Sequence, residues 1–297
     1  MTPPAAARTD LALDSTEWRA RRRSHEARVD ALVADHLTRH RDGVKHPVAD
    51  FLFTYYSLRP AQLRRWHPGA GVLLREATAE PGYLTVPGGA VLDHETLLAR
   101  RRPTVAWIRG LLAATATRPG QWGCFGLHEW AMLYRQSPDE VRHRDWPLRI
   151  DPAPVLAQQP PHCTHFDAFR FFTDAARPLN HLQLARTDQL AHEQPGCLHA
   201  NMDLYKWAYK LSPLLASELV VDCFELAREI RTVDMRASPY DLAALGLAPV
   251  RVETAAGRAE YTRLQRGFAE RAAPLRTRLI DECDRILALP VASGHGQ

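Results

Sequence analysis

Lysine is almost absent from this chain of 297 residues. Among its 38 arginine and lysine residues, only Lys45, Lys206 and Lys210 are lysine, which leaves 35 arginines. Arginine binds phosphate and carboxylate through a planar, bidentate contact that lysine cannot make. A GC-rich genome produces the same bias and is the simpler explanation. The arginine content therefore does not by itself identify an anion-binding protein.

Cysteines in pairs and long apolar runs are also missing. The chain has five cysteines, an odd number, and no CxxC spacing. This pattern favours reduced thiols in a cytoplasmic protein over a disulfide scaffold. No run approaches the roughly 18 apolar residues of a membrane-spanning helix, and the N-terminus lacks the apolar core of a signal peptide. We expect a soluble, intracellular protein with no membrane partner.

The common nucleotide-binding and hydrolase motifs are absent. The sequence has no Walker A loop and no GxGxxG between a strand and a helix, which disfavours nucleotide-binding folds. It has no GxSxG nucleophile turn. His128 and Glu129 begin an HE pair, but the HExxH zinc motif needs a histidine at position 132, where the chain has Met132. Any catalytic or binding site must therefore be built from side chains that do not form one of these standard motifs.

Helical hydrophobic patterns dominate the chain, and no βαβ alternation is present. With 45% hydrophobic residues, the chain can bury a large core. We predict an all-α fold, with one mostly helical domain over residues 14–290. Residues 1–13 and 291–297 are predicted to be disordered tails. A short β-hairpin is predicted near residues 71–87, and a proline-rich long loop at 151–161.

The strongest functional signal lies in residues 197–242. There His199 and Asp203 are four residues apart, so a helix places them on one face. Asp234 lies near the end of a second helical pattern. Acidic and imidazole groups among aromatic and aliphatic residues are typical of catalytic sites. We therefore expect the chemistry of the protein in this region.

One hypothesis is a metal site built from inward-facing side chains of several helices. Residues 162–167 add the densest group of potential ligands, although His165 and Asp167 could instead cap a buried helix. Helical di-iron proteins usually repeat a Glu-x-x-His motif, which is missing here, but two histidines and one carboxylate suffice for a non-heme iron site. The candidate ligands are His128, Glu129, His165, Asp167, His199, Asp203 and Glu225.

A second hypothesis is the excision of a nucleobase. Such an enzyme takes the base out of the stack and holds it between aromatic rings, while a carboxylate supports the positive charge that develops on the sugar. Arginines would contact the phosphates. The candidate carboxylates are Asp203, Asp234 and Glu129, and the candidate rings are Trp66, Trp130, Tyr205 and Trp207. The spacing does not identify one carboxylate among the three.

Five segments carry a resemblance to a known family. They are DFLFTYYSLRPAQLRRWHPG, GCFGLHEWAMLYR, HFDAFRFF, EQPGCLHANMDLYKWAYKL and DMRASPYDL. Over most of residues 45–265 the chain resembles an actinobacterial family commonly labelled 3-methyladenine DNA glycosylase. The chain lacks the LPGxGxxTA hairpin of the well-understood alkylation glycosylases, so no catalytic residue is carried over.

The resemblance implies a DNA-repair enzyme that hydrolyses the bond between an alkylated purine and deoxyribose without a metal or other cofactor. Because of this resemblance, the N-glycosylase is the first hypothesis. The second is a metal-dependent enzyme, such as an oxygenase, that acts on a small molecule. The glycosylase hypothesis predicts an arginine-lined groove that leads to an aromatic pocket with one buried carboxylate. The metal hypothesis predicts that His165, His199 and their acidic neighbours converge within about 5 Å.

Overall fold

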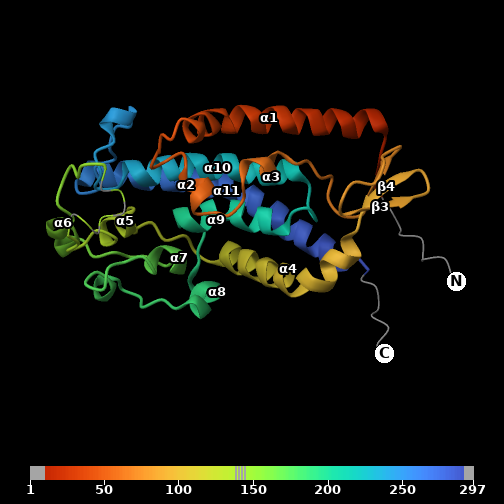
Figure 1. Cartoon of the computed structure of the whole chain (residues 1–297). Coiled ribbons are helices and arrows are strands. Elements are labelled where there is room, and N and C mark those ends of the chain that lie inside the picture. Colours follow the sequence, from red (N-terminus) through yellow and green to blue (C-terminus); the bar gives the residue numbers. More distant parts are fainter. Residues whose placement is uncertain (1–10, 138, 140, 142, 144, 291–297) are drawn as a thin grey trace.

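Eleven α-helices make up most of the described chain, which in this computed structural model comprises residues 11–137, 139, 141, 143 and 145–290 (Figure 1). The predicted all-α class is confirmed. The helices are α1 (Ser15–Arg41), α2 (Phe51–Thr54), α3 (Pro60–Arg64), α4 (His94–Thr117), α5 (Leu127–Ala131), α6 (Pro152–Gln158), α7 (Phe166–Phe169), α8 (Gln189–His192), α9 (Leu198–Leu211), α10 (Ser217–Arg236) and α11 (Ala255–Ala288).

Helix α9 forms the centre of the helical assembly. Eleven of its fourteen residues are buried, and it packs against both α10 and α11. Helix α4 packs on α11, and α1 lies along α10 on the opposite side (Figure 1). The main hydrophobic cluster runs from Val29 to Ile286, so the long helices share one core. Among the described residues, no helix combines the length and apolar character needed to cross a lipid bilayer.

A small sheet lies at one end of α1 (Figure 1). Its strands are β1 (Leu11–Leu13), β2 (Val72–Arg75), β3 (Tyr83–Val86) and β4 (Gly89–Leu92), in the order β1-β2-β4-β3. The prediction of a hairpin near residues 71–87 paired the wrong strands. In the structure β4 lies between β2 and β3 and pairs with both. The actual hairpin joins β3 to β4 through Pro87 and Gly88, where the φ of 86° suits a glycine.

The prediction of a disordered tail over residues 1–13 is wrong for Leu11–Leu13. These residues form β1, which pairs in parallel with β2, and Leu13 packs with Trp66 and Val72. The backbone ladder and one buried side chain therefore hold this segment on the sheet. The other predicted tail residues, 1–10 and 291–297, lie outside the described residues.

The long loop predicted at residues 151–161 is also wrong, because α6 occupies most of it. Asp151 caps this helix by accepting a hydrogen bond from the amide of Ala153, at 2.9 Å. Pro152 occupies the first turn, where proline costs no hydrogen bond. Val155 and Leu156 are buried. Proline in this segment therefore starts a helix and does not prevent one.

Candidate metal centre

Buried ionisable side chains converge where α5, α7, α9 and α10 meet. Helix α9 supplies His199 and Asp203, both on its buried surface as the four-residue spacing predicts. Asp234 comes from the last turns of α10, and His128 from α5. His165 directly precedes α7. These side chains lie close together, but His165 and His199 belong to two different groups of potential ligands and do not share the single point that the metal hypothesis predicts.

The first group consists of His128, His199 and Asp234, and we name it the two-histidine group. One potential ligand atom from each residue lies within 4.8 Å of the others. The His128 Nε2 and the Asp234 Oδ1 are 2.8 Å apart, and the imidazole rings are nearly perpendicular at 4.4 Å between centroids. Among the described residues nothing makes a hydrogen bond with the His199 ring, although this residue is only 7% exposed.

The second group consists of His165, Glu193 and Asp203, and we name it the two-carboxylate group. Its ligand atoms also lie within 4.8 Å of one another. The His165 Nε2 is 3.2 Å from the Glu193 Oε1 and 3.4 Å from the Asp203 Oδ2. The His165 and His199 rings are 5.4 Å apart between centroids. The two groups are therefore neighbours, with His199 between the other two histidines.

Two buried cations compensate part of the negative charge. The Arg231 Nη1 donates to the Glu129 Oε1 at 2.6 Å and to the Asp234 Oδ2 at 2.8 Å. The Lys206 Nζ donates to the Asp203 Oδ2 at 2.9 Å and also to Asp167. These contacts fix the orientation of both central aspartates. They also explain why these four carboxylates can lie together in the interior.

The environment gives each histidine a different proton affinity. Burial lowers the pKa of His199 well below its usual value, and the nearby His128 lowers it further. Burial also acts to lower the pKa of His128, but the Asp234 carboxylate outweighs it and raises this pKa well above the usual value. For His165, burial is outweighed by Glu193 and Asp203, and the pKa rises to about 10. His199 is therefore the neutral imidazole, with its lone pair free to bind a ligand.

Both central aspartates remain ionised. Burial acts to raise the pKa of Asp203, but the Lys206 ammonium and the His165 imidazole hold it far below the usual value. The Tyr56 hydroxyl donates to the Asp203 Oδ1 at 2.7 Å. His128 likewise holds the pKa of Asp234 below the usual value against the effect of burial. The site therefore offers charged oxygen donors beside imidazole nitrogens.

The prediction that Glu225 is a ligand is wrong. The Glu225 carboxylate faces α1, where it accepts hydrogen bonds from the Arg28 Nε at 3.0 Å and the Arg28 Nη2 at 2.8 Å. Asp234 lies nine positions after Glu225. Nine steps along an α-helix rotate the side-chain direction by about 900°, or two and a half turns. The two carboxylates therefore project from opposite sides of α10.

The structure does not assemble the four predicted aromatic residues into one base-binding pocket. Trp130 is completely buried, and its Nε1 donates to the carbonyl of Ala237 at 2.8 Å. Tyr205 is also completely buried, and Trp207 packs under the ammonium of Lys206. Trp66 lies near the sheet and not beside Asp203 or Asp234. Trp130, Tyr205 and Trp207 fill the core, and Trp66 packs in a separate cluster at the sheet.

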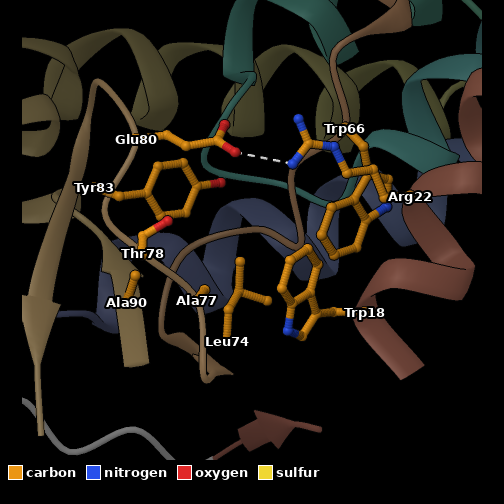
Figure 2. A pocket seen from close by; sticks show the side chains of 9 residues that line it. All are labelled: Trp18, Arg22, Trp66, Leu74, Ala77, Thr78, Glu80, Tyr83 and Ala90. Carbon is orange, nitrogen blue, oxygen red and sulfur yellow. Dashed lines mark hydrogen bonds and ion pairs between the residues drawn. The ribbon is translucent and has the colours of Figure 1, made fainter. Parts of the chain in front are cut away.

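Trp66 lines a separate hollow between α1 and the sheet (Figure 2). This cavity of about 50 Å³ is bordered by an ion pair in which the Arg22 Nη1 and the Glu80 Oε1 are 2.9 Å apart. The indole nitrogens of Trp18 and Trp66 donate to the carbonyl of Arg75 and to Glu218, both at 3.0 Å. These hydrogen bonds hold the two indole rings in place. The Arg22–Glu80 ion pair occupies the polar edge of the cavity.

Several residues of the site were missed from the sequence. Glu193, Tyr56 and Arg231 lie in segments without a recognisable ligand pattern. Cys124 is the one cysteine of the five that is partly exposed, and its Sγ is 3.8 Å from the His128 Nδ1. Glu193 had one available signal, since it is an acidic residue only six positions before His199.

A buried amide connects the loop before α5 to the turn before α9. The Gln194 Oε1 accepts from the amides of Gln121 at 2.8 Å and Gly196 at 2.7 Å. The Gln265 Nε2 donates to the carbonyl of Gly196 at 2.6 Å. A Cβ on Gly196 would lie 2.6 Å from the Gln121 carbonyl oxygen, so only glycine permits this close approach. We name this arrangement the glutamine brace.

Comparison with protein-family models, curated proteins and solved structures found no match.

Proposed function

We propose that this chain is a metal-dependent enzyme that acts on a small molecule, with its cation held by His128, His199 and Asp234. The observation that carries the proposal is that one potential ligand atom from each of these side chains lies within 4.8 Å of the others, while the His199 ring makes no hydrogen bond with any described residue. Two histidines and one carboxylate leave open coordination positions for substrate, and this ligand set is typical of non-heme iron enzymes. Zinc and manganese also accept it.

The surroundings support a catalytic cation. Arg231 holds the second oxygen of Asp234, as is common for a carboxylate that orients toward a metal. His199, Glu129 and Asp167 each retain an exposed fraction of 7 to 8%. This narrow exposure suits a small substrate better than a nucleic-acid duplex. When bound, the cation would act as a Lewis acid or activate a water molecule.

Metal content tests the proposal directly. We expect tag-free protein purified from metal-supplemented culture to hold near-stoichiometric iron, manganese or zinc by elemental analysis. His128→Ala and His199→Ala should each lose this metal, because each removes a ligand. His25→Ala is the matched control, since His25 is equally buried but contacts the carbonyl of Leu63 far from the site. A metal-free wild type, or equal metal in all four proteins, would refute the proposal.

The excision of an alkylated base from DNA is the second candidate. The family resemblance supports it, and so do two ionised, buried carboxylates, Asp203 and Asp234, that could stabilise a positively charged sugar. If it is correct, the protein should release free base from alkylated DNA in the presence of EDTA, and Asp203→Asn or Asp234→Asn should abolish the release. Base release that chelation leaves intact would favour the glycosylase, whereas no release at any protein concentration would eliminate it.

A further inference from the structure

We infer that the two-carboxylate group of His165, Glu193 and Asp203 binds a second divalent cation beside the first. This inference rests on the proposed metal-dependent function. It adds a separate site with its own ligands, because no residue of the two-carboxylate group belongs to the two-histidine group. The structure would then hold a two-metal centre with His199 at the junction of the two groups.

The separations between the donor atoms match those around a metal ion. Ligands placed about 2.1 Å from a tetrahedral ion are about 3.4 Å from one another. The His165 Nε2 is 3.2 Å from the Glu193 Oε1 and 3.4 Å from the Asp203 Oδ2. A charge-assisted hydrogen bond between such groups is usually about 2.7–2.9 Å long, as in the 2.8 Å contact of His128 with Asp234. The donor atoms of the two-carboxylate group are therefore farther apart than hydrogen-bonded atoms, at separations that would accommodate an ion between them.

His165 is an incompletely satisfied side chain. It is only 1% exposed, and neither ring nitrogen makes an aligned hydrogen bond among the described residues. A buried polar group without a hydrogen-bond partner destabilises the folded state. A cation between Nε2 and the carboxylates would give this nitrogen a directed bond in place of the two longer contacts.

The carboxylates of the group have few direct lysine or arginine partners. Glu193 is 2% exposed, and its carboxylate accepts a neutral hydrogen bond from Gln189 at 2.6 Å. In the described part of the chain this carboxylate makes no direct ion pair with an arginine or lysine, although the buried Arg276 interacts with it electrostatically. Asp203 shares the single ammonium of Lys206 with Asp167. Arg170 contacts Asp167 at 3.3 Å but is partly exposed. Among the described residues, Lys206 is therefore the one lysine or arginine that pairs directly with a carboxylate of this group.

The ligand sets differ in chemistry. One imidazole and two carboxylates form a harder, more oxygen-rich set than two imidazoles and one carboxylate, and such ligands suit manganese, iron or magnesium. The ring of His199 lies 4.4 Å from that of His128 and 5.4 Å from that of His165. Adjacent cations of this kind hold a substrate from both sides and stabilise the attacking and leaving atoms together.

The number of bound ions tests the inference. Full-length protein is stripped with chelator, dialysed and titrated with Mn²⁺, and free Mn²⁺ is followed by electron paramagnetic resonance. We expect two equivalents for the wild type, and one for Glu193→Gln, which preserves the size of the side chain. His165→Gln is a second variant of the same site, and Glu229→Gln, an exposed position on α10, is the control that should keep two. Circular dichroism verifies that each variant is folded.

The outcomes separate this inference from the proposed function. One equivalent in the wild type that is lost in His128→Ala but kept in Glu193→Gln would overturn the second site and leave the first. A Glu193→Gln protein that binds two ions, or none, would also overturn a separate second site. A wild type that binds no Mn²⁺, Fe²⁺ or Zn²⁺ would overturn both proposals.

Discussion

Replacing Arg231 by methionine is expected to lower the free energy of unfolding by about 3–5 kcal/mol. The Arg231 side chain is 3% exposed, and its guanidinium is the one lysine or arginine group that contacts Glu129 and Asp234 in the described structure. Methionine fills a similar volume but leaves the buried Glu129 without its counter-charge and leaves Asp234 paired with His128 alone. The measurement is urea denaturation followed by circular dichroism.

Arg271→Met is the matched control for this experiment. Arg271 makes an equally short ion pair with Glu229, at 2.6 Å, but both side chains are 52% exposed. An exposed pair of this kind contributes about 0–1 kcal/mol. A small effect for Arg231→Met, similar to that of Arg271→Met, would show that the buried carboxylates do not need the guanidinium. Adding Glu129→Gln to Arg231→Met should restore part of the lost stability, because it removes the stranded charge.

Trp130→Ala is expected to cost about 3–5 kcal/mol of stability, because it removes a large side chain from the interior. Trp130 is completely buried, its Nε1 is hydrogen-bonded to Ala237, and the guanidinium of Arg149 lies 5.3 Å from the ring centroid. Trp107→Ala provides the comparison at an exposed position, 42% accessible on α4, and should cost about 0.5 kcal/mol or less. Urea denaturation measures both.

This pair of variants also bears on the predicted role of Trp130 in gripping a base. A core residue affects the stability of the whole fold, whereas a ring held free for a ligand affects binding with little effect on stability. A Trp130→Ala protein as stable as the wild type would contradict the packing role and would favour the predicted role of this ring in binding a base.

Local sequence patterns predicted the parts of the site that lie within one helix. The four-residue spacing of His199 and Asp203 is sufficient to place both on one side of α9, because helical geometry fixes that relation. Helical periodicity likewise predicted the dominant α-helices. The same local reasoning also reached His128, His165 and Asp234 as candidates, because ionisable residues in apolar surroundings are unusual.

The pairing of those candidates could not be predicted. His128 and Asp234 are 106 positions apart, and no pattern in the sequence specifies which loop brings them together. Glu225 was predicted to be a ligand because the residue type was right, but the orientation of α10 depends on its packing and directs this carboxylate to Arg28. Strand β4 was missed because GAVL is too short to distinguish from the helix that follows.

The glutamine brace has a consequence for how the protein moves. Gln194 and Gln265 join the loop before α5 to the turn before α9, and the Gln194 Nε2 reaches the Thr164 hydroxyl at 3.4 Å, just ahead of α7. Displacing any one of these segments breaks buried hydrogen bonds that the others share. Local opening reactions in proteins involve such contiguous units. We therefore expect the backbone around the site to open as one cooperative unit, so that the site's histidines keep their mutual spacing during smaller fluctuations.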